Sequence, residues 1–157
     1  MATDEPGGDQ EHRSGRPGPE EQATPDLELT LPARAENVAV VRHAFGGLGD
    51  ALDVPDQTLS DIKLAVTEAC TNVVVHAYEE VEGPLAVAAY VRDRRLVVVV
   101  SDEGRGIVPR PDSPGLGLGL PLIATLAESL ELGTGANDET EVRMTFRLDD
   151  AHIGEAA

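Results

Sequence analysis

The chain has 157 residues with 12 basic and 29 acidic side chains, so its formal net charge is -17. That length fits one hydrophobic core, and an apolar share of 41% is enough to fold one. The acidic balance and an aromatic share of 3% argue against nucleic-acid binding, because phosphate neutralisation and base stacking are both poorly provided for. Apolar runs such as Leu96–Val100 fall far short of the roughly 20 residues of a membrane-spanning helix.

The ends of the chain differ in composition from the middle. Residues 1–26 contain seven acids, two arginines, four prolines and four glycines, and predict a disordered acidic tail. Residues 27–149 are the expected folded domain, and 150–157 a short C-terminal tail. The first residues lack the basic start and apolar stretch of a signal peptide, and the single Cys70 cannot form an internal disulfide. We therefore expect a cytoplasmic protein.

The first half of the domain predicts one strand and two helices. Three leucines alternate with polar residues over 27–31 and predict a strand that ends at Pro32. Apolar residues at spacings of three and four then predict a helix that stops within Gly46–Gly49. A second helix is expected from about Gln57 to Tyr78, with Cys70 as a packed thiol beside its apolar stripe. The residues of that stripe are Ile62, Ala65, Val66, Ala69, Val73 and Ala77.

The second half predicts two hairpins around a third helix. The β-rich segments 85–92 and 96–102 flank Asp93–Arg95 and predict the first hairpin. After a loop rich in glycine and proline, a helix is expected to run from the glycine-rich segment 115–120 to about Ser129. Segments 130–133 and 140–148 predict the second hairpin. This order favours an α+β fold, a two-layer α/β sandwich with helices on one face of a mixed sheet.

Three polar elements are candidates for chemistry. Glu68 and Asn72, four residues apart, project from one face of the second helix. They form either a solvated polar face or a site in which the Asn72 amide oxygen binds Mg²⁺ and Glu68 accepts a proton. Asp102, at the end of an apolar strand, either caps an ordinary turn or accepts a hydrogen bond from the adenine amine, with Gly104 and Gly106 allowing the backbone close to the base.

The third element is a glycine run that leads directly into a helix. Gly115, Gly117 and Gly119 alternate with leucines and end at Leu120. Such a run is either a flexible loop or a phosphate cradle, because glycine lets backbone amides point inward and a helix N-terminus attracts anions. A dinucleotide-binding motif is excluded, since a proline-rich loop rather than a strand precedes these glycines.

Together these segments resemble the GHKL ATPase superfamily, which includes DNA gyrase and the histidine kinases. Glu68–Tyr78 resembles its N box, Asp102–Gly106 its first glycine box and Gly115–Leu120 its second. Thr140–Phe146 is similar to its closing strand, although the preceding loop has Asn-Asp-Glu where the family commonly has glycine. The small size and the segment Arg34–Asn37 resemble, within the superfamily, bacterial anti-sigma-factor serine/threonine kinases.

The resemblance implies a Bergerat-type ATP-binding fold and a role for each matching residue. Asn72 would hold Mg²⁺ against the phosphates, and Glu68 would be the base that deprotonates the acceptor hydroxyl. Arg42, on the first helix, would contact partner proteins. The residues implied in ATP binding are Asn72, Asp102, Gly104, Gly106, Gly115, Gly117, Gly119, Leu120 and Thr140.

The resemblance also implies a function. We expect an ATP-dependent anti-sigma factor that binds a sigma factor and phosphorylates a serine or threonine of an anti-anti-sigma protein, and that forms a homodimer. A second reading is a regulatory module that binds ATP without catalysis. The ATPase domain of a sensor histidine kinase is disfavoured, because no helix with a phospho-acceptor histidine is present in the sequence.

Overall fold

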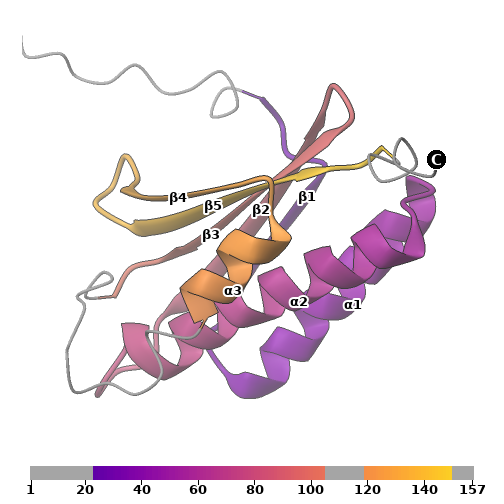
Figure 1. Cartoon of the computed structure of the whole chain (residues 1–157). Coiled ribbons are helices and arrows are strands. Elements are labelled where there is room, and N and C mark those ends of the chain that lie inside the picture. The colour runs from indigo at the N-terminus through magenta and orange to yellow at the C-terminus, as the bar shows by residue number, and fades with distance from the viewer. Residues whose placement is uncertain (1–22, 105–118, 150–157) are drawn as a thin grey trace, which may run out of the picture.

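A computed structural model describes residues 23–104 and 119–149, and in these ranges three α-helices cover one face of a five-stranded sheet (Figure 1). The α+β class and the two-layer arrangement that the sequence predicts are confirmed. The elements are, in chain order, β1 (Leu27–Pro32), α1 (Ala35–Ala51), α2 (Asp56–Asn72), the π-helix η1 (Val73–Ala77), β2 (Pro84–Arg92), β3 (Arg95–Asp102), α3 (Gly119–Leu126), β4 (Ser129–Thr134) and β5 (Thr140–Arg147).

The sheet is antiparallel throughout, so the mixed sheet expected from the sequence is wrong. Its strand order is β1-β2-β3-β5-β4, and each neighbouring pair is antiparallel. The single helix α3 returns the chain so that β4 runs parallel to β3, but β5 lies between these two strands and pairs with both. The β2–β3 hairpin turns through Asp93 and Arg94, whose φ angles of 50° and 61° fit the tight turn that matches strand twist.

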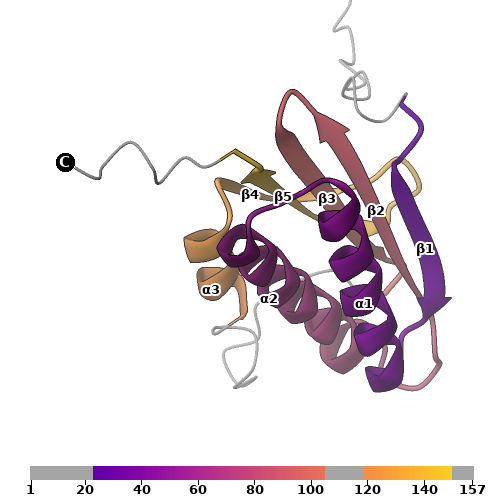
Figure 2. The same ribbon diagram turned by 90° about the vertical axis from the view of Figure 1, so that its right-hand side faces the viewer.

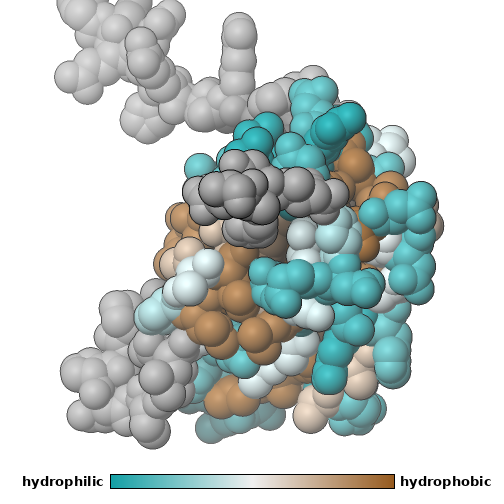
Figure 3. Space-filling model, turned by 45° about the vertical axis from the view of Figure 1, so that its right-hand side comes forward, coloured by the Kyte–Doolittle hydropathy of each residue, from teal (hydrophilic) through white to brown (hydrophobic). Residues whose placement is uncertain are grey.

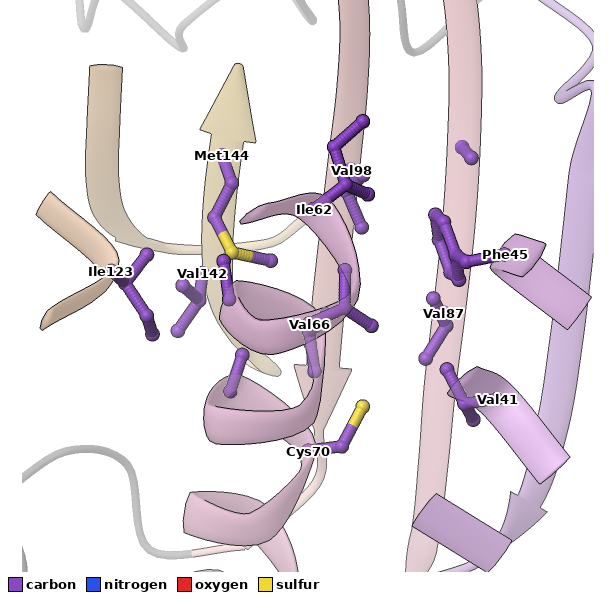
Figure 4. Packing of buried hydrophobic residues seen from close by; sticks show 14 of the residues in the cluster. Val41, Phe45, Ile62, Val66, Cys70, Val87, Val98, Ile123, Val142 and Met144 are labelled. Carbon is purple, nitrogen blue, oxygen red and sulfur yellow. The ribbon is translucent and has the colours of Figure 1, made fainter. Parts of the chain in front are cut away.

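The core lies between the sheet and the helices and is built mainly of aliphatic side chains (Figure 4). Val41 and Phe45 of α1 pack over Val87, while Ile62 and Val66 of α2 cover the middle of the sheet. Viewed from the side, α2 lies between α1 and α3 (Figure 2). Position 70 is buried with this stripe, and burial raises the pKa of the Cys70 thiol to about 12, as expected of a packed thiol.

Helix α1 does not end at its glycines, as the sequence predicted, but continues to Ala51. The reason is tertiary packing, because Gly49 is buried at the contact with α2. A Cβ atom at position 49 would lie 2.4 Å from Cδ1 of Leu59, so glycine permits the close approach of the chains there. Packing therefore outweighs the low helix propensity of these glycines.

Two other boundaries differ from the predictions. Helix α3 ends at Leu126 rather than near Ser129, because the Glu128 N–H donates to the Thr145 carbonyl, at 2.8 Å, and draws the chain into the sheet. The second helix reaches Ala77 as expected, but its last turn is the π-helix η1, which periodicity did not predict. No helix within the described ranges combines the length and apolar character needed to cross a bilayer.

The course of α1 predicts opposite effects of alanine at two of its glycines. Gly47 is exposed, and a Cβ atom added there would have nothing within 4 Å, so Gly47→Ala should stabilise the protein by about 0.5–1 kcal/mol. Gly49→Ala should destabilise it, because the added methyl group would collide with Leu59. Urea unfolding of both variants measures the two effects. A destabilising Gly47→Ala would show that the helix does not run through this position.

Candidate functional site

The site is built along one side of α2. Glu68 and Asn72 lie on successive turns of this helix, and both side chains are partly buried. The apolar stripe beside them is fully buried, including Val66, Ala69 and Cys70. Burial of that stripe fixes the rotation of the helix, so the polar pair is held at the rim of the core.

The Asn72 amide lies against the first residue of α3. A Cβ atom at Gly119 would be 2.8 Å from Nδ2 and 3.1 Å from Oδ1 of Asn72, so only glycine leaves the amide undisturbed. Leu120 follows, partly buried and packed against the core, and anchors this end of the helix. The structure thus brings Asn72 to Gly119, with Glu68 one helical turn before Asn72 on α2. The other predicted phosphate-loop residues, Gly115 and Gly117, lie outside the described residues, as does Gly106, which was predicted to lie near the base.

Asp102 forms the second part of the site, at the end of β3. It lies on the helix-facing side of the sheet and is only 8% exposed. The Gly104 N–H donates to its Oδ1 at 2.9 Å. Burial raises the pKa of Asp102, and the bond from Gly104 offsets part of this rise. Thr140 is its cross-strand neighbour on β5, as the prediction of a shared base pocket requires.

Gly104 is required by the close approach of the π-helix. A Cβ atom at this position would lie 2.1 Å from the carbonyl oxygen of Ala77. Since a backbone carbonyl cannot move aside as a flexible side chain can, a larger residue would displace the turn after Asp102. Gly104, which the sequence assigned to the close approach of a base, is thus also needed for the turn after Asp102 to pack against η1.

The loop before Thr140 adopts the left-handed backbone that glycine usually provides. Asp138 has a φ of 61°, a conformation that aspartate tolerates better than most residues. The Gly135 N–H donates to the Glu139 carbonyl at 2.8 Å, and the Asn137 N–H donates to the Glu139 carboxylate, also at 2.8 Å. These bonds close the loop without a glycine at position 138.

Arg42 is exposed on α1, which packs on the side of α2 opposite to α3 (Figure 2). Its role as a contact for partner proteins stays a prediction. The nearby segment Arg34–Asn37 ties α1 to the sheet: Arg34 pairs with Glu82, and the Asn37 side-chain amide donates to the Pro32 carbonyl at 2.7 Å.

Tyr78 is the residue of this region to which the sequence assigned no role. It follows the π-helix directly, and its hydroxyl group hydrogen-bonds to the backbone at the start of β2 and just after the end of β3. The signal in the sequence was weak: a tyrosine six residues after Asn72 and a glycine at position 83. The sequence did not indicate that Tyr78 and Gly83 would be in contact.

Comparisons with known proteins agree with this geometry. A family model described as "Histidine kinase-like ATPase domain" matches residues 31–146, and the fold is that of this class. A protein of Halalkalibacterium halodurans named serine-protein kinase RsbW is 36% identical over 121 residues, covering 68% of this chain and 74% of its own. The RsbW of Bacillus thuringiensis is 34% identical over the same length, covering 68% and 76%. The chain therefore belongs to the RsbW family of histidine kinase-like ATPases.

A solved structure also shares the fold. The crystal structure of the RsbU and RsbW domains of a Mycobacterium tuberculosis protein matches 80% of this chain at 26% identity, with a TM-score of 0.63. The match covers 33% of that longer chain, so this chain corresponds to about one third of it.

The buried carboxyl group predicts how stability depends on pH. Because burial raises the pKa of Asp102 above its ordinary value of 3.8, the folded state holds this proton at pH values where the unfolded state has lost it. The contribution of Asp102 to stability is therefore greatest below that ordinary value and is lost as the pH rises through its folded pKa. The asparagine of Asp102→Asn does not titrate. The free energy of unfolding of this variant should therefore increase, relative to that of the wild type, as the pH rises through the folded pKa of Asp102. Urea unfolding at a series of pH values measures the difference, and one that is constant or of opposite sign would contradict the assignment.

The contact between Gly119 and Asn72 predicts a selective loss of nucleotide binding. Gly119→Ala should leave the fold intact, since alanine favours a helix, but its methyl group would push the Asn72 amide aside. We expect the affinity for MgATP to fall about tenfold, which is the loss of one ligand contact. Calorimetric titration measures this effect, with Gly133→Ala on β4 as the control, because nothing lies within 4 Å of its added carbon. Equal affinities for the two variants would contradict the role given to this contact.

Proposed function

We propose that the protein is an ATP-dependent anti-sigma factor, which binds a sigma factor and phosphorylates a serine or threonine of an anti-anti-sigma protein. The observation that carries this proposal is the seating of the Asn72 amide against the start of α3, one helical turn from Glu68. Two relatives that are 34–36% identical over most of the domain are named serine-protein kinases, which supports the kinase activity.

The residues present fit an adenine nucleotide with Mg²⁺. At one end Asp102 offers a buried carboxylate that can accept a hydrogen bond from the adenine amine, and Thr140 is its cross-strand neighbour. We assign the remaining contacts to the base to Gly104 and Gly106. At the other end the glycine at the start of α3 leaves room beside Asn72, whose amide oxygen suits Mg²⁺. We assign the phosphates to the backbone of Gly115, Gly117, Gly119 and Leu120, where a helix N-terminus favours anions.

When bound, MgATP supplies the phosphoryl group to be transferred. The protein contributes position and charge, which is what this reaction mainly requires. Glu68 would hold the acceptor hydroxyl group and take its proton, since a carboxylate at the rim of the core can reach both substrate and solvent. Asn72 would fix the metal one turn away on the same rigid helix.

The helix-covered side of the molecule provides a surface for partners. Val40 on α1 is 46% exposed and Leu64 on α2 is 42% exposed, and Figure 3 shows hydrophobic side chains among hydrophilic ones on this side. Arg42 on α1 is the residue that we assign to the sigma factor and its antagonist in turn. The charge of -17 suits a basic partner such as a DNA-binding sigma factor. A homodimer, a cytoplasmic location and the absence of direct nucleic-acid or membrane binding belong to the same proposal.

Transfer of label from radiolabelled ATP to a purified anti-anti-sigma protein tests the proposal. Glu68→Gln keeps the shape of the side chain but removes the base, so the rate of transfer should fall at least about a hundredfold while ATP binding is retained. The matched control is Glu36→Gln, an exposed glutamate in the first turn of α1. Unchanged transfer by Glu68→Gln would refute the assigned base. Tight ATP binding by the wild type without transfer would instead favour a regulatory module that lacks catalysis.

A further inference from the structure

The hydroxyl group of Tyr78 joins the end of β3 to the start of β2. It accepts a hydrogen bond from the Glu103 backbone N–H, at 2.9 Å, and donates one to the Pro84 carbonyl, at 2.5 Å. Glu103 directly follows Asp102, so this bond holds the backbone at the point where Asp102 leaves the sheet. Leu85, which follows Pro84, is the cross-strand partner of Asp102. The two hydrogen bonds therefore hold both the strand that carries the carboxylate and its neighbour.

A second contact from the same segment holds the next residue. Ala77, at the end of η1, places its carbonyl oxygen so close to Gly104 that a Cβ atom there would lie 2.1 Å away. The Gly104 N–H in turn donates to Oδ1 of Asp102. The direction of the Asp102 carboxylate thus depends on a backbone turn that two consecutive residues, Ala77 and Tyr78, hold in place.

The ring of Tyr78 is itself held by its surroundings. A Cβ atom at Gly83 would lie 2.0 Å from Cε1 and 2.2 Å from Cζ of the ring, so the ring lies directly against this backbone. The Gly83 carbonyl accepts a hydrogen bond from the Ala33 N–H, at 2.9 Å, which ties the turn to the end of β1. The phenol is therefore part of a rigid frame rather than a free side chain.

The π-helix places Tyr78 where it is. Val73–Ala77 widens the last turn of the helix that carries Asn72, and Tyr78 then has extended backbone, with φ -126° and ψ 127°. Extra residues of this kind inside helices occur frequently at functional sites. One continuous segment thus connects Asn72, the residue assigned to Mg²⁺, with Tyr78, whose hydroxyl group holds the backbone next to Asp102.

The surroundings of Tyr78 raise the pKa of its hydroxyl group further above the ordinary value of 10, so the group is protonated at neutral pH. Burial raises the pKa of Tyr78, the negative charges of Asp102 and Glu103 raise it further, and the Glu103 N–H offsets part of the rise. A neutral hydroxyl group can donate to Pro84 and accept from Glu103 at the same time, as the bridge requires.

We propose that Tyr78 is a positioning residue for base recognition, because its hydroxyl group holds the Glu103–Gly104 turn so that Asp102 selects adenine over guanine. This inference rests on the proposed function, in which Asp102 accepts the adenine amine. Adenine presents a donor at the position where guanine presents a carbonyl acceptor, so a well-fixed carboxylate favours the first and repels the second. A carboxylate on a loose turn discriminates less.

Calorimetric titration of the full chain with MgATP and with MgGTP tests the inference, using Tyr78→Phe. This variant keeps the ring against Gly83 and removes only the hydroxyl group. The affinity for ATP should fall about three- to tenfold, the usual effect of one hydrogen bond. The affinity for GTP should change little, so the ATP-to-GTP preference narrows, while kcat at saturating ATP stays within about twofold of the wild type.

The matched control is Tyr90→Phe. Tyr90 lines a groove of about 190 Å³ on the face of the sheet away from the helices, so its hydroxyl group cannot act on Asp102. An unchanged ATP-to-GTP preference in Tyr78→Phe would overturn the inference and leave the proposed function standing. No preference for ATP in the wild type would instead refute the role of Asp102 itself.

A measurement on the wild type covers the case in which Tyr78→Phe does not fold. The Glu103 amide should exchange its hydrogen more slowly when ATP is bound than when GTP is bound, because the base would tighten the turn that Tyr78 holds. Equal exchange with both nucleotides would overturn the inference.

Discussion

The burial of one stripe of α2 is the constraint on which the rest of the structure depends. Ile62, Val66 and Cys70 lie between the sheet and the neighbouring helices, and each is at most 1% exposed. The small residues Ala65 and Ala69 let the helix approach the sheet closely. A helix held this firmly can neither rotate nor slide, so the positions of Glu68 and Asn72 follow from the packing of the opposite side. The candidate site is therefore as rigid as the core.

The far end of the same helix is also fixed by its contacts. The apolar stripe continues into η1, where Val73 and Ala77 are buried, and this wider turn brings Ala77 and Tyr78 to the end of β3. The acidic chain has a single lysine, at position 63, and the backbone amides at the start of α3 are groups that can favour a phosphate without it. Gly104 and Gly119 each allow close approach to a group on the α2–η1 segment, which is the Ala77 carbonyl for Gly104 and the Asn72 amide for Gly119.

Much of this architecture follows from the sequence, because periodicity reports which side of an element is buried. The alternating leucines of β1 and the stripe of α2 were predicted correctly for that reason. The end of α1 and the pairing of β5 were not, since both are decided by contacts between distant segments: Gly49 with Leu59, and β5 between β3 and β4. The site residues came from motifs whose chemistry is local. The structure brings Asn72 to Gly119 and Asp102 to Thr140, and their roles stay predictions. Tyr78 was overlooked because its contacts are made only after the π-helix redirects the chain.

The place of β5 in the sheet has a consequence for how the protein is made. It is the last of the described strands to leave the ribosome, yet it lies inside the sheet with β3 on one side and β4 on the other. Until it emerges, the helix-facing surface of β3 lacks the neighbours Val142, Met144 and Phe146, and Asp102 lacks Thr140 beside it. Long-range pairing of this kind forms late, because the intervening chain must be ordered first. A nascent chain therefore cannot complete the base pocket until β5 has been synthesised, so nucleotide binding depends on a strand that comes late among the described elements.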